Sequence, residues 1–415
     1  MKNQENKGAT VRPSAWMGDL VNRNPDITME CLIIPGTHDS AAYTLTPLAG
    51  AQKNYLNRAA QAPLIGRIVR SIGAISAVTQ KLTIKEQLQA GVRSLDLRIL
   101  YSAEPRPGHF SLGHNLTCIT LNTCFADIDA FLHENPSEII IVNIKPDWDN
   151  KDTLTPDKQT ALNILLINTF KQRLWQPTNQ DNLLKIPLSR LQGKIILLTK
   201  ELPTNPSEGI FSKGDLILDK WLNQISVENC LSEGKQFFEE NKHNTQHLLE
   251  IDSAPTPSVN KTTALILYKI LSTIKLYQLS CFVIKKLSLN KKNSVSQFLI
   301  DAKETTIEKN GKKIREQLIS DVIPYLDRGG VIFPSDFFDL AITDLFLNAC
   351  LDKAETLYAK SATHLNEASI VNKKPDPDIR YRQSMLNQIS IEQRPFFEEK
   401  KASFETVKID KMKIQ

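Results

Sequence analysis

The sequence lacks several features that would place it in a familiar class of protein. Its six cysteines lie far apart and form no C-x-x-C pair, which argues against a zinc site. It contains neither a G-x-x-x-x-G-K-S/T loop nor a G-x-S-x-G elbow, so nothing supports a P-loop kinase or a serine hydrolase. The formal net charge of +5 over 415 residues is small, and no concentrated basic face indicates nucleic-acid binding.

Long apolar runs are also missing. The most apolar stretch, Thr262–Ile284, is interrupted by Lys269 and Lys275 and is too broken to span a bilayer. The N-terminal sequence MKNQENKGATVRPSAW is polar and has no apolar region of a Sec signal peptide. We therefore expect a soluble protein that meets membrane only from the side. It would be cytosolic or exported without a Sec signal, as a bacterial protein delivered to a host cell would be, and its charged C-terminal tail would suit a translocation signal.

What the sequence does contain is a series of short runs rich in Ile, Leu and Val, which alternate with helix-like stretches at 121–133, 158–175 and 227–241. Continuous apolar strands between amphipathic helices predict a parallel sheet covered on both faces. Eight such strands in one domain predict a TIM-like (β/α)8 barrel, regular or distorted. The expected strands lie near 29–35, 94–100, 110–114, 138–145, 194–199, 215–219, 247–252 and 330–336.

The barrel is expected to occupy residues 16–350, with helical insertions at about 45–80 and 261–320. Both insertions are apolar at helical spacing and carry basic residues, so each could pack on the barrel or contact a membrane. Residues 351–415 are charged and contain proline, and we expect a helical or partly disordered tail there.

Polar residues that could do chemistry follow three of the expected strands. His38 and Asp39 come after a buried strand in IPGTHDS, His114 after a short strand in SLGHNLT, and Asp336 at the end of VIFPSD. The C-terminal ends of strands open onto the active-site face of a parallel barrel. Taken alone, a histidine such as His38 could merely cap a turn.

The predicted strand GVRSLDLRI adds an aspartate and an arginine to these candidates. Period-2 alternation places Asp96 and Arg98 on one face and Arg93 on the other. An acid and an arginine inside a barrel are costly unless they are paired or catalytic. Two histidines with an arginine suit phosphodiester cleavage, because one histidine takes a proton, the other gives one, and the cation stabilises charge on the phosphoryl oxygens.

Four motifs in this order resemble a known family. WMGDL…IIPGTHDS, TIKEQLQAGVRSLDLRI, FLHENPSEIIIVNIK and GGVIFPSDFF cover about residues 16–340. They are similar to the X domain of phosphatidylinositol-specific phospholipases C, in the small bacterial enzymes and in eukaryotic proteins with the X domain alone. The resemblance implies an enzyme that releases diacylglycerol and inositol 1,2-cyclic phosphate from phosphatidylinositol-type lipids at a membrane surface.

The resemblance also implies roles for the residues that match the motifs. His38 would be the general base that deprotonates the inositol 2-hydroxyl, oriented by Asp336. His114 would be the general acid, assisted by Asp39. Arg98, held by Asp96, would take the place that calcium has in metal-dependent relatives, so neither a metal nor another cofactor is expected.

Binding roles are implied for a second set of positions. Lys145 and Asp219 match residues that contact the sugar hydroxyls, while Trp221 and Lys200 stand where the bacterial enzymes have a tyrosine and an arginine. These two departures leave open whether the head group is plain, phosphorylated or glycosylated inositol. The first insertion would then supply a membrane-contacting helix, with Leu64, Ile65, Ile68, Val69 and Ile72 as the contact residues.

The alternative is a catalytically idle X domain that binds lipid or protein partners, because barrel folds host many functions. The sequence favours the enzyme, since an idle copy would be expected to have lost at least one of the six catalytic candidates. A metal-dependent glycerophosphodiester phosphodiesterase would require a cluster of acids in place of Arg98.

Overall fold

The computed structural model describes one compact unit within Arg12–Ala354. The described residues are 12–43, 78–102, 109–114, 116–147, 154–178, 182–222, 226–252, 309–323, 326, 330–336, 346, 349–350 and 353.

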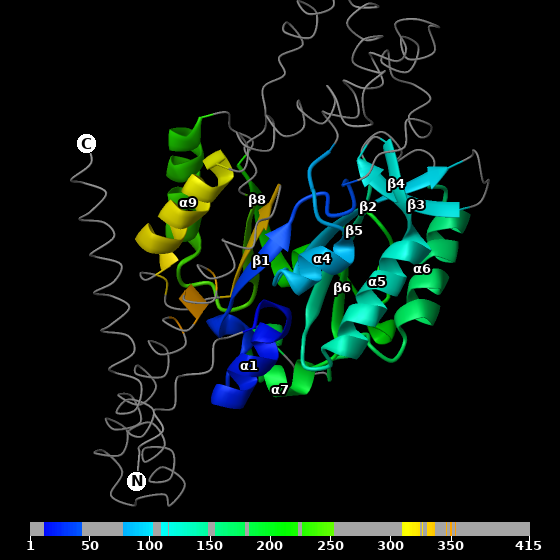
Figure 1. Cartoon of the computed structure of the whole chain (residues 1–415), viewed down its shortest axis with the longest axis horizontal. Helices are drawn as coiled ribbons and strands as arrows, with labels where there is room; N and C mark the ends of the chain where they lie inside the picture. Colours follow the sequence, from blue (N-terminus) through cyan, green and yellow to red (C-terminus); the bar gives the residue numbers. More distant parts are fainter. Residues whose placement is uncertain are drawn as a thin grey trace, which may run out of the picture. The chain divides into compact units, whose positions relative to one another are not determined.

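The centre of this unit is a curved parallel sheet whose strands follow the order of the chain (Figure 1). They pair in the order β7-β6-β5-β2-β1-β10-β9-β8, so the first and last strands of the chain lie side by side. Within the described residues β7 and β8 do not pair with each other, so the ring is open at that seam. The predicted TIM-like barrel is therefore confirmed, in its distorted form. The parallel strands are β1 (Ile33–Thr37), β2 (Ser94–Ser102), β5 (Ile140–Pro146), β6 (Ile195–Thr199), β7 (Ile210–Ser212), β8 (Ile217–Trp221), β9 (Leu248–Asp252) and β10 (Val331–Ser335).

One of the eight predicted barrel strands is wrong. The segment 110–114 forms β3 (His109–His114), which pairs antiparallel with the far end of β2 and with β4 (Leu116–Thr120), outside the ring. β7 occupies the vacant place in the barrel, and its three residues are too short to give a periodic signal. The hairpin β3–β4 therefore extends the C-terminal end of β2 instead of adding a strand to the ring.

Helices cover the outside of the sheet, and the three predicted helices are confirmed as α5, α6 and α9. Helices α4, α5 and α6 pack outside β2, β5 and β6. Helices α1 and α7 lie near the N-terminal ends of the strands (Figure 1). A further helical segment at 309–321 lies beside α9. The helices are α1 (Trp16–Arg23), α4 (Ile84–Gln89), α5 (Leu121–Glu134), α6 (Pro156–Phe170), α7 (Leu188–Leu191), α8 (Lys213–Leu216) and α9 (Val227–Asn241), with short 3-10 turns at Pro13–Ala15, Met29–Cys31, Leu183–Lys185 and Pro206–Glu208.

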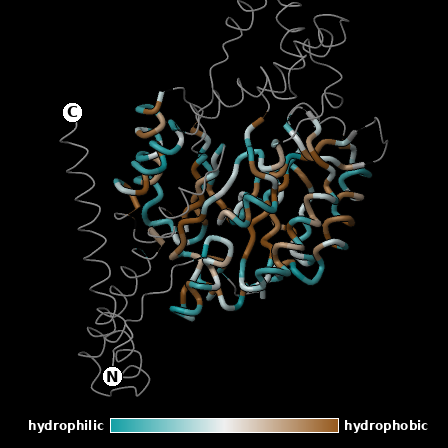
Figure 2. The backbone as a smooth tube through the Cα atoms, in the orientation of Figure 1, coloured by the Kyte–Doolittle hydropathy of each residue, from teal (hydrophilic) through white to brown (hydrophobic). Residues whose placement is uncertain are grey.

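The two faces of β2 differ as alternation predicts. Leu95, Leu97 and Ile99 point outward and join the apolar core with α5 and α6, where the strands are brown in Figure 2. Asp96 and Arg98 point into the barrel and make ion pairs there. On the neighbouring β5 the inward residues become more polar toward the C-terminal end of the strand, from Ile141 through Asn143 to Lys145. The barrel interior is therefore apolar at its lower end and charged at its C-terminal end.

Arg93 points outward and anchors the lower end of the barrel. Its guanidinium pairs with Glu138 at 2.6 Å, and neither side chain is exposed. Glu138 also accepts hydrogen bonds from the backbone N–H groups of Met17 and Gly18, while Arg93 donates to the carbonyl of Ser14. This buried pair therefore fixes the start of α1 against β2 and β5.

Parts of the predicted organisation fall outside the described residues. They include the membrane-contact candidates Leu64, Ile65, Ile68, Val69 and Ile72, most of both insertions and nearly all of the tail 351–415. Within the described part of the chain, no helix is both long enough and apolar enough to cross a membrane.

Candidate active site

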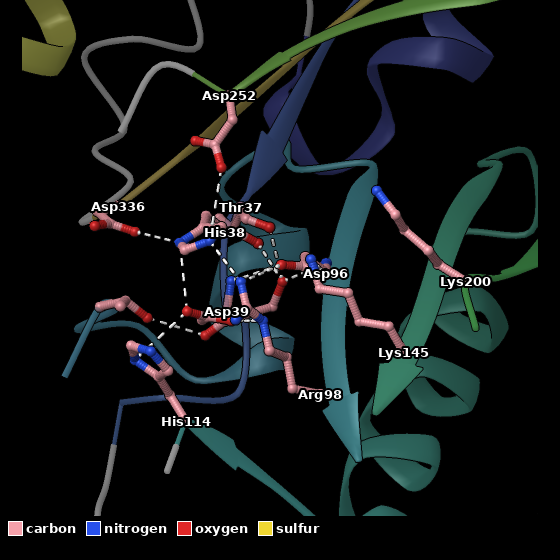
Figure 3. Close-up of polar contacts among 12 residues, drawn as sticks. Thr37, His38, Asp39, Asp96, Arg98, His114, Lys145, Lys200, Asp252 and Asp336 are labelled. Carbon is pink, nitrogen blue, oxygen red and sulfur yellow. Dashed lines mark hydrogen bonds and ion pairs between the residues drawn. The ribbon is translucent and has the colours of Figure 1, made fainter. Parts of the chain in front are cut away.

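The predicted catalytic residues come together at the C-terminal ends of the strands (Figure 3). His38 and Asp39 follow β1, Asp96 and Arg98 lie on β2, and Asp336 follows β10. The sixth, His114, reaches the same place from the antiparallel strand β3, where the ladder with β4 shifts register between Leu112 and Gly113. The bulge and the hairpin therefore deliver a residue that no barrel strand carries.

The turn after β1 is held by side chains from the segment that precedes β2. Gln80 donates from Nε2 to the carbonyls of His38 and Ser335, both at 2.8 Å, and so links the ends of β1 and β10. Gln87 on α4 donates to the carbonyl of Ser40 at 2.8 Å. A capping box between Thr83 and Glu86 begins this helix. The turn is thereby fixed before any ligand binds.

Asp39 has a φ of 44°, in the left-handed region that non-glycine residues seldom adopt. Aspartate tolerates this region better than most residues. The conformation is maintained because the Asp39 carbonyl accepts hydrogen bonds from Thr79 Oγ1 at 3.0 Å and from the Ala42 N–H at 2.8 Å. It directs a fully buried carboxylate toward His38, Arg98 and the hairpin histidine. Backbone strain at such a position is typical of functional sites.

The two ring nitrogens of His38 have different surroundings. Nδ1 lies 3.1 Å from Asp336 Oδ1 and 3.4 Å from Asp39 Oδ2. Nε2 lies 2.7 Å from Arg98 Nη2 and 3.6 Å from Asp252 Oδ2. Because a guanidinium can only donate, this contact assigns the proton of the neutral ring to Nδ1, where Asp336 accepts it. Nε2 then carries the basic lone pair of the ring, which accepts a hydrogen bond from Arg98 Nη2.

Two opposing effects act on the pKa of His38. Burial by itself lowers it, but the charges of Asp39, Asp252 and Asp336 outweigh burial and raise the pKa to about 10. The contact with Arg98 acts in the other direction, because it exists only with the neutral ring. His38 is thus a strong base whose proton-accepting form is held by a neighbouring cation.

Arg98 is the central cation of the site. Its Nε contacts Asp39 Oδ1 and its Nη2 lies 3.5 Å from Asp96 Oδ2. Burial lowers the pKa of Arg98, but Asp39 and Asp96 raise it above its ordinary value. For the carboxylate of Asp96 burial acts in the opposite direction and raises the pKa. The charges of Lys145, Arg98 and His38 outweigh burial and hold the pKa of Asp96 well below the usual range. Both groups are therefore charged at neutral pH.

His114 lies on the other side of Asp39. Its Nδ1 is 3.5 Å from Asp39 Oδ2, the same oxygen that approaches His38. Burial raises the pKa of Asp39, and the charges of His114, His38 and Arg98 more than offset this and lower it. One ionised carboxylate is thus shared by both histidines and the arginine.

The predicted binding residues form a second cluster beside the first. Lys145 contacts Asp96 at 3.0 Å, and Lys200 contacts Asp219 at 3.0 Å. Trp221 lies two residues after Asp219 on β8, and 57% of it is exposed. The structure therefore brings these four residues to the barrel mouth, with the indole open to solvent and not packed on another ring within the described residues.

Three charged residues of this region were not among the predicted ones. Lys213 and Glu250 form a pair at 2.6 Å in the barrel interior, and Lys213 also reaches Asp219 at 3.3 Å. Asp252, at the end of β9, faces His38. The only available signal was that Glu250 and Asp252 alternate near the end of the predicted strand 247–252. Lys213 gave none, because the short strand before it was missed.

His38, Asp39 and Asp96 could in principle bind a cation, because one ligand atom of each lies within 4.8 Å of the others. The guanidinium of Arg98 already contacts all three of these residues. A positive charge is therefore built into the place where these ligands converge, and a divalent ion there would have to displace Arg98.

Comparison with known proteins agrees with this geometry. Residues 54–201 match the family described as "Phosphatidylinositol-specific phospholipase C, X domain". The chain is 31% identical over 131 residues to human PI-PLC X domain-containing protein 2, covering 31% of this chain and 42% of that protein. It is 29% identical over 199 residues to 1-phosphatidylinositol phosphodiesterase of Listeria monocytogenes, covering 48% of this chain and 52% of that protein. These alignments span only about half of the relatives' length.

Solved structures extend the likeness to most of the barrel. The phosphatidylinositol-specific phospholipase C of Listeria monocytogenes gives a TM-score of 0.52 at 18% identity, over 82% of this chain and 99% of that chain. The enzyme of Staphylococcus aureus gives 0.51 at 15% identity, over 81% and 97%. At these identities the likeness concerns the fold. The fold of this chain is thus similar to that of the bacterial enzymes, and residues 54–201 are similar in sequence to the X domain of phosphatidylinositol-specific phospholipases C.

Proposed function

We propose that this protein is a metal-independent phospholipase C that cleaves phosphatidylinositol-type lipids. The observation that carries the proposal is the arrangement around Asp39: His38 bound to Asp336 on one side, His114 on the other, and Arg98 in contact with Asp39 itself. Two imidazoles and a cation within one charge network suit the in-line displacement of a phosphodiester. The relatives named for this activity support the same reaction class.

In the proposed reaction His38 acts through Nε2 as the general base. It removes the proton of the inositol 2-hydroxyl while Asp336 holds Nδ1–H. The hydroxyl oxygen forms a bond to phosphorus, and the bond from phosphorus to the diacylglycerol oxygen breaks. His114 gives its proton to that leaving oxygen, with Asp39 as the anionic partner of its ring. The products are inositol 1,2-cyclic phosphate and diacylglycerol, and Arg98 stabilises the charge that develops on the phosphoryl oxygens.

The second cluster would bind the head group. The ammonium groups of Lys145 and Lys200 and the carboxylate of Asp219 are suited to polyol hydroxyls, and the exposed face of Trp221 offers a surface for the ring. We propose that the protein works at a membrane surface, with Leu64, Ile65, Ile68, Val69 and Ile72 as contact residues. Cosedimentation with liposomes tests this part, because a variant with these five residues made polar should bind less.

The test of the reaction is release of water-soluble inositol phosphate from phosphatidylinositol vesicles in EGTA. We expect release by the wild type and loss of release in His38→Ala. His133→Ala is the matched control, because His133 is exposed on α5, on the outside of the barrel, and should not change the rate.

Each other result has a defined meaning. Release that requires calcium would overturn the metal-free mechanism. No release with or without calcium, from plain, phosphorylated or glycosylated inositol lipids, would overturn the enzyme proposal. If the protein still bound these vesicles, it would be a lipid-binding module with an idle site.

A further inference from the structure

Asp252 is a carboxylate that the proposed mechanism does not use, although it faces the base. It is the last residue of β9, two strands away from β1 in the sheet, and its side chain is only 13% exposed. Its Oδ2 lies 3.6 Å from Nε2 of His38, the nitrogen that would take the substrate proton. In Figure 3 Asp252 and Asp336 approach the imidazole from different directions, each toward its own ring nitrogen.

The neutral and protonated forms of His38 need different partners at Nε2. In the neutral ring Nε2 accepts a hydrogen bond from Arg98 Nη2 at 2.7 Å. Once Nε2 carries a proton, it and the guanidinium are both donors, and two cations then face each other at contact distance. The arrangement that suits the base before proton transfer therefore cannot persist after it.

Asp252 is placed to resolve this conflict. It is the second group beside Nε2, and a modest turn of the ring or of the carboxylate converts 3.6 Å into a charge-assisted hydrogen bond. The other carboxylates beside this ring, Asp336 and Asp39, approach Nδ1. The preceding inward acid on β9, Glu250, is bound to Lys213 at 2.6 Å and is thereby committed elsewhere.

We propose that Asp252 is a positioning residue that accepts Nε2–H when His38 is protonated and so releases Arg98 Nη2 toward the phosphoryl group. The inference rests on the proposed function and deepens it. Proton removal from the attacking hydroxyl and delivery of the cation to the developing charge become one coupled event. No further reactant is required, because the proton comes from the substrate and returns to the medium when the base is reset.

The charged groups around His38 determine its pKa and therefore the pH dependence of the proposed proton transfer. Those that face or adjoin the ring among the described residues are Asp39 from the turn after β1, Asp96 and Arg98 from β2, Asp252 from β9 and Asp336 after β10. Removing one carboxylate lowers the pKa of His38, because the protonated ring loses an anionic neighbour. The neutral, active form then exists at lower pH, so the acidic limb of kcat/KM should move down.

The test uses Asp252→Asn in the full-length chain, with Asp129→Asn as the control. Asp129 pairs with Arg173 on the outer surface, so the control removes one negative charge far from the site. We expect Asp252→Asn to lower kcat by on the order of tenfold with little change in KM, because a weaker base is a poorer proton acceptor. The acidic limb of kcat/KM should move down by about one pH unit or more, as loss of one close opposite charge predicts. Asp252→Ser serves the same purpose if the amide variant does not fold.

A measurement that needs no turnover separates this inference from the proposed function. Imidazole ¹⁵N spectra, with the His38 signals identified by their loss in His38→Gln, give the tautomer and the titration midpoint of the ring. A lower midpoint in Asp252→Asn but not in Asp129→Asn is expected. An unchanged midpoint, or an unchanged pH profile in an active enzyme, would overturn the role of Asp252 alone. Inactivity of the wild type together with the expected shift in midpoint would overturn the proposed function and the coupling to it.

Discussion

Replacing Arg98 by lysine tests whether the geometry of this cation matters or only its charge. The guanidinium reaches Asp39 through Nε and both Asp96 and His38 through Nη2. A lysine ammonium is a single point on a flexible stem and cannot satisfy these three partners at once. Arg98→Lys therefore keeps the net charge of the site but removes at least the donor that faces the reacting centre.

The size of the effect follows from that lost donor. Removing one preorganised donor from a developing oxyanion costs about 10²–10³ in kcat. Because lysine retains the charge, we expect the lower end, a fall of about 10²-fold, which corresponds to roughly 2.7 kcal/mol of transition-state stabilisation. The free energy of unfolding should change little in Arg98→Lys. Arg98→Met should in addition lose about 3–5 kcal/mol of stability, because the buried carboxylate of Asp39 loses the guanidinium that contacts it and Asp96 keeps only Lys145.

The assay is the initial rate of inositol phosphate release in EGTA over a range of lipid concentrations, together with urea unfolding of each variant. Arg173→Lys is the matched control, because it makes the same exchange in an exposed ion pair on the outer surface. A kcat of Arg98→Lys above about a third of the wild-type value would contradict this expectation. A charge at that position would then be sufficient, and the fork geometry would have no role.

Two predictions concern residues outside the candidate site that stabilise the barrel. Arg93→Met should lower the free energy of unfolding by about 3–5 kcal/mol in urea melts, because it leaves the unexposed carboxylate of Glu138 without its cation. The double variant Arg93→Met/Glu138→Leu should recover part of that loss, and a single variant as stable as the wild type would contradict the argument. Gly209→Ala should cost more than about 1 kcal/mol, because Gly209 has a φ of 87° and an added Cβ would lie 2.8 Å from the carbonyl oxygen of Trp175. A melting temperature equal to that of the wild type would show that the turn can relax.

The residues around β2 show what the sequence could reveal. Strict alternation over GVRSLDLRI is enough to separate the inner pair, Asp96 and Arg98, from the outward Arg93, and the structure has this arrangement. The period of a strand is a local property, so a single segment carries the information. The same holds for α9, whose predicted bounds 227–241 match the observed Val227–Asn241.

The errors lie where neighbours in space decide the structure. The segment 110–114 is a true strand, but only its partner determines that it runs antiparallel to β2 and stays outside the ring. Asp252 was part of a predicted strand, yet its proposed role depends on the distance of 3.6 Å between its Oδ2 and Nε2 of His38. That histidine lies more than two hundred positions earlier in the chain. Local propensity contains neither of these facts.

The contacts of Arg98 also set a condition on how the site can bind a phosphodiester. Before a substrate arrives, this guanidinium is already bound to Asp39 and Asp96, so phosphoryl oxygens must compete with two carboxylates for it. A monoanionic phosphodiester in the ground state is a weak competitor, whereas the transition state carries more charge and competes better. The resting ion pairs thus reduce binding of the substrate more than binding of the transition state, which is the difference on which catalysis depends. Because protonation of His38 removes a third acceptor from Arg98 at the same moment, the cation becomes available when the charge on phosphorus develops.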